Sequence, residues 1–376
     1  MKKIVLLNNI ARDIIIFRKH LIQYLIAHNY TVYALATDFT EKTKKEVENL
    51  GAIPFSYSFA RGGLNPLADL KNMLHLIRIL RKIQPDVVLS SFAKPVIFGT
   101  IAAKKAHVPK IIAMIEGLGF LFTEQPTKQT LKTKIVRHIQ IFLYRLSLPL
   151  ADTVIFLNHD DPCDLLDKNN IKVKKTVVLG GIGLNLADYP FTPAPEHPIS
   201  FIFVARLLRE KGIFQFLQAA EQIKSKYPQI TFKVIGNLDT ENFGALKKEE
   251  LQEYIEKEII TYPGFVHNVS QWIDQSSVFV LPSYYREGVP RSTQEAMAIG
   301  RPIITTDVPG CRETVIDGQN GFLIPKWNVP ALVSAMEYFI LKPSEITRMG
   351  LESYQIAVEK FDGKKVNQKL LKIIQQ

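Results

Sequence analysis

Short apolar runs alternate with amphipathic segments along the whole chain, and this alternation limits the possible folds more than any other feature. In the first half, runs rich in Val, Ile and Leu predict strands at 4–7, 31–36, 87–90, 111–115, 153–157 and 176–179. In the second half they predict strands at 199–204, 231–235, 278–281, 302–305 and 321–324. Strands that alternate with helices form parallel sheets with crossover helices. The pattern therefore predicts an α/β protein.

The chain is too long for one ordinary hydrophobic core, since it has 376 residues, so two domains are expected. Four prolines cluster between 190 and 198, where they predict a linker. The expected division is an N-terminal domain at 1–190, a linker at 191–198 and a C-terminal domain at 199–362. The remaining residues, 363–376, are expected to form a helix that returns to the N-terminal domain.

The excess positive charge lies entirely in the first half of the chain. Residues 1–190 hold 26 Lys and Arg against 15 Asp and Glu, whereas residues 191–376 hold 21 against 21. A basic half favours phosphates, anionic lipid or nucleic acid as partners. Only two cysteines are present, which fits a reducing compartment. No run of about 18 apolar residues occurs, so no transmembrane helix is expected.

The segment Lys128–Leu148 is predicted to be a basic amphipathic helix. Its apolar residues follow helical spacing, and basic residues form a neighbouring stripe. The apolar residues are Leu131, Ile135, Ile139, Phe142 and Leu146. A helix of this kind can lie on an anionic membrane surface. The alternative is an ordinary packing helix with a solvated basic face.

Two cations flank a predicted strand end early in the second half. Arg206 follows the strand at 199–204, and Lys211 precedes an amphipathic helix that starts at Ile213. Cations beside a helix N-terminus form a suitable site for a diphosphate. Taken alone, this spacing is most often a surface feature.

A second polar constellation lies about 75 residues further along the chain. Glu287 and Glu295 stand eight positions apart, joined by Gly288, Val289 and Pro290 and by a run that resembles a helix start. Eight helical residues extend about 12 Å, so the two carboxylates could contact opposite ends of one elongated polar ligand. Ligands of α/β folds bind where strands end and helices begin, and the layout suggests a nucleotide-sugar site.

Several short runs together resemble the signature of glycosyltransferase family 4, whose members are retaining enzymes. The runs are Leu-Pro-Ser at 281–283, Glu-Gly-Val-Pro at 287–290, Glu-Ala-Met-Ala at 295–298 and Gly-Arg-Pro at 300–302, together with Arg206 and Lys211. The resemblance implies two Rossmann-like domains facing across a cleft, the GT-B fold. It covers nearly the whole chain and is densest from Ile199 to Ile324.

The first half is similar to a narrower group, the bacterial transferases that act on polyprenyl-diphosphate-linked sugars. The similarity rests on Arg-Gly-Gly-Leu-Asn-Pro at 61–66 and Glu-Gly-Leu-Gly at 116–119. It implies acceptor contacts from Arg61, Glu116 and Gly117, and Asn9, after the first strand, is a further candidate for substrate binding. Many family members carry a Gly-rich loop after the first strand, whereas this chain has Asn9 there, and many carry His where this chain has Glu116.

The resemblance also implies roles for the donor-site residues. Glu295 would hold the donor ribose hydroxyls, and Glu287 would hold the hydroxyls of the transferred sugar. Gly288, Val289 and Pro290 would bring backbone close to sugar and phosphate, with Arg291 as a further contact. Arg206 and Lys211 would stabilise the charge that grows on the departing diphosphate. No metal and no other cofactor is then required.

One acidic cluster resembles a metal motif, because Asp160, Asp161 and Asp164 surround Cys163. It follows a predicted strand, so helix capping is the favoured role.

The expected function is therefore retaining transfer of a hexose or N-acetylhexosamine from a nucleotide sugar, with UDP favoured. The acceptor is expected to be a polyprenyl-diphosphate-linked saccharide of a bacterial surface glycan, such as an O-antigen, a capsule or a glycoprotein glycan. The expected location is cytoplasmic, on the inner face of the membrane. Two alternatives remain: a sugar-nucleotide epimerase of the same fold, and a basic protein that binds polyanions.

Overall fold

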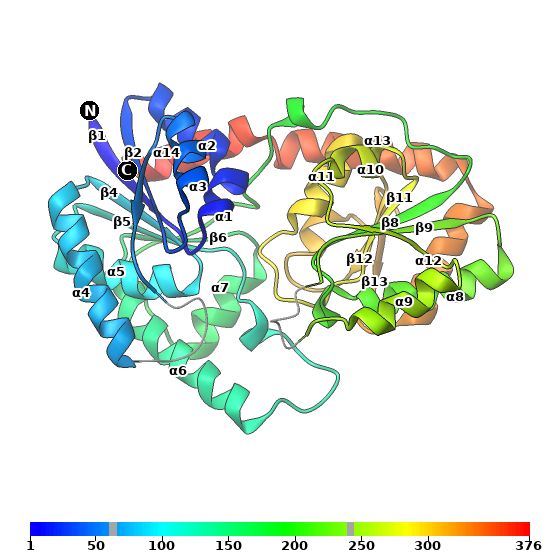
Figure 1. Ribbon diagram of the computed structural model, residues 1–376, viewed down its shortest axis with the longest axis horizontal. Helices are drawn as coiled ribbons and strands as arrows, with labels where there is room; N and C mark the ends of the chain where they lie inside the picture. Colours follow the sequence, from blue (N-terminus) through cyan, green and yellow to red (C-terminus); the bar gives the residue numbers. More distant parts are fainter. Residues whose placement is uncertain (60–65, 239–243) are drawn as a thin grey trace. The chain divides into compact units, whose positions relative to one another are not determined.

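The computed structural model describes residues 1–59, 66–238 and 244–376. The chain divides into two compact units, each with its own parallel sheet (Figure 1). Unit 1 comprises Met1–Leu121, Thr130–Ile182 and Gly363–Gln376. Unit 2 comprises Phe122–Gln129 and Gly183–Asp362.

The described part of unit 1 holds a seven-stranded sheet in the order β3-β2-β1-β4-β5-β6-β7, with every pairing parallel. Its strands are β1 (Lys2–Leu7), β2 (Tyr30–Ala36), β3 (Ile53–Ser56), β4 (Val87–Ser91), β5 (Lys110–Ile115), β6 (Thr153–Phe156) and β7 (Thr176–Val178). The central strands β1 and β4 are apolar and buried along most of their length, because helices cover both faces of a doubly wound sheet.

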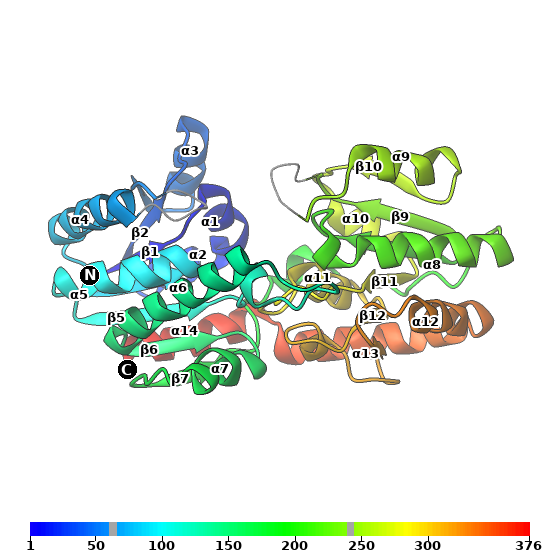
Figure 2. The same ribbon diagram turned by 90° about the horizontal axis from the view of Figure 1, so that it is seen from below.

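Helices cover both faces of the unit 1 sheet. They are α1 (Ala11–Phe17), α2 (Lys19–Ala27), α3 (Glu41–Asn49), α4 (Pro66–Ile83), η1 (Pro95–Gly99), α5 (Thr100–Lys105), η2 (Phe120–Phe122, whose last residue belongs to unit 2), α6 (Leu131–Ser147), η3 (Leu148–Leu150), α7 (Asp160–Leu165), η4 (Asp167–Asn169) and α14 (Gly363–Gln375). Crossovers between parallel strands are right-handed, so a helix lies on one face when the chain moves across the sheet in one direction and on the other face when it moves in the opposite direction. Accordingly, α4, α5 and α6 lie on one face, and α1, α2 and α14 lie on the other (Figures 1 and 2).

The described part of unit 2 holds a six-stranded parallel sheet in the order β10-β9-β8-β11-β12-β13. Its strands are β8 (Ser200–Val204), β9 (Thr231–Ile235), β10 (Thr261–Gly264), β11 (Val278–Leu281), β12 (Ile303–Thr306) and β13 (Gly321–Ile324). The two central neighbours, β8 and β11, are buried at every residue. Because all strands run the same way, their carboxyl ends meet at one edge of the sheet, which is where a ligand is expected.

Two groups of helices pack on the two faces of the unit 2 sheet (Figure 1). The helices are η5 (Leu186–Asp188), η6 (Arg209–Lys211), α8 (Ile213–Lys226), α9 (Lys248–Glu256), α10 (Val269–Asp274), α11 (Arg291–Ile299), η7 (Arg312–Thr314), α12 (Val329–Leu341) and α13 (Ser344–Lys360). Helix α12 packs with α8, and α13 packs with α11. Among the described residues, no helix is long and apolar enough to cross a bilayer.

The boundaries of the units differ from the expected domain division in two places. Unit 2 begins at Gly183, and it also takes in Phe122–Gln129 from the first half of the chain. The stretch expected to be a linker, 191–198, is packed within unit 2: the side chain of Phe191 contacts the ring of Tyr354 at 4.8 Å, and buried Arg301 donates to the Thr192 carbonyl at 3.1 Å. Phe191 and Thr192 therefore attach this proline-rich stretch to unit 2. Residues 363–376 form α14, which belongs to unit 1 and packs with α2.

Each strand expected from the apolar runs is present to within one or two residues. Two observed strands, β3 and β10, were not expected. Both are edge strands, each contains a proline, and each is only partly buried. An edge strand needs less apolar surface and tolerates proline, so it lacks the continuous apolar run from which the other strands were predicted.

Candidate functional site

The predicted donor-site cations lie at the carboxyl edge of the unit 2 sheet. Arg206 is exposed two residues beyond the end of β8. Lys211 ends the short helix η6, and Gly212 then turns the chain into α8 with φ +80°. A Cβ atom at Gly212 would lie 2.1 Å from the Pro282 carbonyl oxygen. Only glycine therefore allows the chain to pass this close to the end of β11 and present Lys211 there.

Lys211 forms an ion pair with Glu287, so the structure brings these two predicted residues together. Each side chain is only 13% exposed. Ser283 Oγ also lies 3.4 Å from a Glu287 carboxylate oxygen, and the Lys211 ammonium lies 5.1 Å from the centre of the Tyr285 ring. The pair thus joins the loop after β8 to the loop after β11, at neighbouring strand ends of one sheet.

The backbone of these two loops is fixed by hydrogen bonds to one carbonyl. The Glu210 carbonyl oxygen accepts from the backbone N–H groups of Tyr284 and Tyr285, at 2.8 and 3.0 Å, and from Ser283 Oγ at 3.2 Å. The Lys211 and Glu287 side chains are consequently mounted on two loops that hold one another in place.

The turn between the two glutamates is packed closely on the following loop. Gly310 approaches it so tightly that a Cβ atom there would lie 2.6 Å from the Gly288 carbonyl oxygen. The Val289 carbonyl accepts from the Gln294 side-chain amide at 3.1 Å, and Pro290 precedes the first residue of α11. Helix α11 starts at Arg291, so only the second half of the Glu287–Glu295 span is helical. The 12 Å helical separation expected between the carboxylates therefore does not apply.

Glu295 is held by two donors. Tyr189 Oη donates to Glu295 Oε1 at 2.8 Å, and Arg291 Nε donates to the same oxygen at 2.9 Å. Burial and then the nearby Glu295 carboxylate raise the pKa of the Tyr189 phenol above its usual value, so it remains a donor. Burial alone would lower the pKa of Arg291, but Glu295 and Tyr189 raise it. Arg291, predicted as a ligand contact, thus braces Glu295.

Sequence reasoning missed the segment Phe122–Gln129, which belongs to unit 2. Thr123 Oγ accepts from the Arg286 backbone N–H at 3.0 Å, and the Gln125 side-chain amide donates to Glu210 Oε1 at 3.3 Å. Glu124 forms an ion pair with Lys326. The segment therefore braces both loops that carry Lys211 and Glu287. It contains no recognisable motif, and only long-range contacts reveal its position.

In unit 1, Glu116 and Gly117 follow β5 directly. Glu116 forms an ion pair with Arg18, whose side chain is 3% exposed. The Arg18 guanidinium also lies 3.3 Å from Ser91 Oγ at the end of β4. Arg18 was not predicted; it marks the break between α1 and α2 and has no motif around it.

The other acceptor-side predictions give a mixed picture. Asn9 follows β1 at the same edge as Glu116, and its carbonyl accepts from the Thr37 backbone N–H and hydroxyl at 3.0 and 2.7 Å. Arg61 lies outside the described residues.

The acidic cluster at 160–164 forms the first turns of α7. The acidic residues were expected to cap the helix, but the cap comes from Asn158. Asn158 Oδ1 accepts from the backbone N–H groups of Asp160 and Asp161 at 3.1 and 2.9 Å. The residue that accepts from these N–H groups, Asn158, lies two positions before the first residue of α7, because a side chain reaches the unpaired N–H groups of a helix from before its start. Within the described ranges, no group of three His, Cys, Asp or Glu side chains could hold a metal ion.

Comparison with known proteins agrees with this architecture. The family model of glycosyl transferases group 1 matches residues 188–355, and the model described as glycosyl transferase 4-like matches residues 3–158. Together they cover both halves of the chain. The chain therefore belongs to the glycosyltransferases that these two models describe, and its two parallel-sheet α/β units form the GT-B fold.

Relatives of the chain include bacterial transferases named for undecaprenyl-diphosphate-linked sugars. It is 29% identical over 330 residues to the N,N'-diacetylbacillosaminyl-diphospho-undecaprenol alpha-1,3-N-acetylgalactosaminyltransferase of Campylobacter jejuni, covering 84% of this chain and 83% of that one. It is 25% identical over 285 residues to the UDP-Gal:alpha-D-GlcNAc-diphosphoundecaprenol alpha-1,3-galactosyltransferase of Escherichia coli, covering 72% and 70%. Among solved structures, Anabaena HepE in complex with UDP and glucose is similar over the full length of both chains, with a TM-score of 0.80 and 17% identity.

Proposed function

We propose that the protein transfers a hexose or N-acetylhexosamine from a UDP sugar to a polyprenyl-diphosphate-linked saccharide, with retention of anomeric configuration and without a metal ion. The glycosyltransferase class follows from the family. The substrate class is supported by the two relatives, whose names specify undecaprenyl-diphosphate-linked acceptors and, for one of them, UDP-galactose as donor.

The observation that carries the donor side of the proposal is the Lys211–Glu287 pair at the ends of β8 and β11. A donor diphosphate beside Lys211 and Arg206 places negative charge next to two cations, and these stabilise the charge that grows on the leaving group. Glu287 then accepts hydrogen bonds from hydroxyls of the transferred sugar. Glu295, at the other end of the segment, accepts from the ribose hydroxyls.

The proposed reaction exchanges one bond at the anomeric carbon for another. The bond from that carbon to the diphosphate oxygen breaks, and a bond to an acceptor hydroxyl oxygen forms on the same face. The acceptor proton passes to the departing phosphate oxygen. Since the cations Arg206 and Lys211 neutralise the leaving group, the step needs no metal ion.

The acceptor side of the proposal rests on unit 1. Glu116 and Gly117, held beside Arg18 after β5, would contact the acceptor saccharide. Asn9, at the neighbouring strand end, and Arg61 would add further polar contacts. A carboxylate is a good acceptor for sugar hydroxyls, and the ion pair with Arg18 holds the Glu116 carboxylate in place.

A panel of UDP and GDP sugars against polyprenyl-diphosphate-linked acceptors, with products analysed by mass spectrometry and NMR, tests the proposal. We expect transfer from a UDP sugar, an α-linked product from an α-linked donor, and full activity in EDTA. Glu287→Gln should abolish transfer, whereas Glu249→Gln, at an exposed position of α9, should not. Inversion, loss of activity in EDTA, or conversion of a UDP sugar without acceptor would each contradict a part of the proposal.

We also propose that unit 1 docks on the inner face of the cytoplasmic membrane through α6, next to its lipid-linked acceptor. The apolar residues predicted to form one stripe of this helix are exposed: Leu131 by 74%, Phe142 by 55% and Leu146 by 50%. Exposed cations accompany them, including Lys132 and Lys134. Flotation with anionic liposomes tests this. The docking proposal would be refuted if liposome binding did not change with salt concentration and persisted after Lys132 and Lys134 were neutralised.

A further inference from the structure

Exposed apolar side chains gather on two helices of unit 1. Of fifteen large hydrophobic side chains exposed among the described residues, eight lie on α4 and α6. They are Leu67, Leu70 and Leu74 of α4, and Leu131, Ile135, Ile139, Phe142 and Leu146 of α6; together we call them the α4–α6 face. Single exposed leucines need no explanation, but apolar side chains concentrated on two helices of one sheet face favour an interaction surface.

The two helices carry almost no negative charge. Helix α6 contains no Asp or Glu, and α4 contains only Asp69, which is 4% exposed and forms an ion pair with Lys94. Both helices also expose cations, such as Lys71 on α4 and Arg145 on α6. An apolar surface bordered by exposed cations complements an anionic lipid surface, where apolar side chains enter the acyl boundary and cations remain among headgroups.

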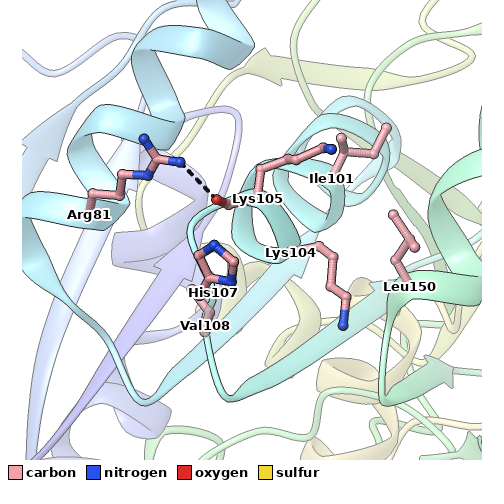
Figure 3. Close-up of a pocket in the computed structure, with 7 residues that line it drawn as sticks. All are labelled: Arg81, Ile101, Lys104, Lys105, His107, Val108 and Leu150. Atoms are coloured by element: carbon pink, nitrogen blue, oxygen red, sulfur yellow. Dashed lines mark hydrogen bonds between the residues drawn. The ribbon is translucent and has the colours of Figure 1, made fainter.

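Both helices lie on the same side of the unit 1 sheet, with α5 packed beside α4 (Figures 1 and 2). The ends of these elements enclose a hollow of about 730 Å³ (Figure 3). Arg81 comes from the last turn of α4, Lys104 and Lys105 end α5, and Leu150 comes from η3, directly after α6. The hollow therefore lies at the C-terminal ends of α4 and α5 and just beyond the end of α6.

The chemistry of the hollow matches a phosphate attached to an apolar chain. Basic side chains surround it, including His107, and none of its lining residues is acidic. Arg81 donates to the Lys105 carbonyl at 3.1 Å, which fixes its guanidinium at the rim (Figure 3). The other lining residues, among them Ile101 and Leu150, are apolar. Cations at helix C-termini interact favourably with the helix dipole, but that role does not require basic residues of different elements to line one hollow together with apolar residues.

We propose that the α4–α6 face is the membrane-binding surface of unit 1 and that the hollow receives the phosphate of an anionic phospholipid headgroup. This rests on the proposed membrane docking of α6, and extends it to a second helix and a defined headgroup site. The face then inserts apolar side chains along two helices, while the hollow supplies preference for anionic lipid.

Vesicle binding by the full-length protein tests the apolar part. Leu70→Asn with Leu74→Asn alters α4, and Phe142→Asn with Leu146→Asn alters α6. The matched control is Leu341→Asn with Leu351→Asn in unit 2, where exposure is similar. We expect each of the first two pairs to weaken binding to phosphatidylglycerol-containing vesicles by roughly tenfold or more per side chain, since a buried leucine loses its transfer free energy. The control should bind as the unaltered protein does.

The hollow is tested with Lys104→Gln and Lys105→Gln together. The control, Lys42→Gln with Lys45→Gln on α3, removes the same charge from exposed positions elsewhere in unit 1. We expect the hollow variant to lose roughly thirtyfold in binding to phosphatidylglycerol vesicles, about fivefold per cation, and to keep its weaker binding to phosphatidylcholine. The control should lose much less.

Specific outcomes would overturn the proposal. Unchanged binding of the α4 variant would remove α4 from the surface. Equal losses in the hollow variant and the α3 control would show a general charge effect without a site. Thermal stabilisation by inorganic phosphate equal to that by vesicles would assign the hollow to a soluble anion, and a dimer dissociated by the α4 or α6 changes would assign the face to a second copy. Transfer to a detergent-solubilised acceptor tests the enzymatic proposal separately, because it needs no membrane.

Discussion

The hydrogen bond from Tyr189 to Glu295 leads to a sharp prediction about donor recognition. Both described donors to Glu295, Tyr189 Oη and Arg291 Nε, bind its Oε1 atom. They fix the rotation of the carboxylate, and Oε2 is then the oxygen directed to the ribose hydroxyls in the proposed site. Tyr189→Phe removes one of the two anchors and leaves the carboxylate charge in place.

The expected magnitude follows from the kind of bond that is lost. A hydrogen bond to a charged group contributes about 1.5–3 kcal/mol. Arg291 still holds Glu295 in the variant, so we expect about half of this, near 1.1 kcal/mol, to appear in the binding of UDP. That is about a sixfold rise in Kd. Glu295→Ala, which removes the carboxylate itself, should weaken UDP binding more than Tyr189→Phe does.

Calorimetric titration with UDP and with 2'-deoxy-UDP measures the effect. The loss in Tyr189→Phe should be larger for UDP than for 2'-deoxy-UDP, because 2'-deoxy-UDP lacks one of the two ribose hydroxyls that the carboxylate is proposed to bind. Tyr338→Phe is a matched control in the same unit: Tyr338 Oη donates to Glu345 at 3.1 Å, and Arg348 shares that carboxylate. This variant should bind both nucleotides normally.

Two results would refute the reasoning, and they differ in what they exclude. If Glu295→Ala binds UDP normally, Glu295 is not a ribose contact, and the donor-site assignment fails. If Glu295→Ala binds weakly but Tyr189→Phe binds normally, or weakens UDP and 2'-deoxy-UDP equally, the carboxylate acts without help from Tyr189.

Three further predictions concern catalysis and stability. Lys211→Ala should lower kcat by roughly 10²–10³-fold, as loss of one transition-state charge contact does, in steady-state assays where Lys248→Ala is unchanged. Gly212→Ala should destabilise the fold by more than about 2 kcal/mol, since it adds a clash with the Pro282 carbonyl to the cost of positive φ. The control is Gly318→Ala, where φ is +74° and a Cβ atom would have no atom within 4 Å. In denaturant unfolding this control should lose only the free energy that positive φ costs. Burial raises the pKa of Tyr144 and of Tyr284 to about 12, so stability from the neutral phenols, present below pH ~10, should be lost as pH rises towards 12 in thermal melts.

The accuracy of the strand predictions follows from burial. The central strands of both sheets are covered on both faces, so each must be a continuous apolar run, and such runs can be recognised in a sequence. Strands β3 and β10 lie at sheet edges, are partly exposed and contain Pro54 and Pro263. Their positions are determined by pairing with β2 and β9 and not by their own composition.

For the candidate site, the sequence indicated the residues at strand ends but not their supports. The motifs placed Lys211 and Glu287 in one predicted donor site, but only the structure shows that the two residues form an ion pair, because β8 and β11 are neighbours in the sheet and not in the sequence. Arg18, Tyr189 and Thr123 could not be predicted, since each contacts a residue far away in sequence and none belongs to a motif. The sequence also did not determine whether the apolar stripe of α6 faces the core or the solvent, because an apolar stripe at helical spacing is compatible with core packing and with membrane binding.

The sequence alone determined that this chain forms two α/β units and that the second carries a nucleotide-sugar motif. Both conclusions depend on local patterns: apolar periodicity sets the strands, and glycine, proline and charge spacing mark the loops between them. Only the tertiary structure decided that Phe122–Gln129 belongs to unit 2, that Arg291 braces Glu295, and that α4 and α6 present their leucines outward. These features depend on which distant segments pack together, and a local pattern is equally compatible with several such partners.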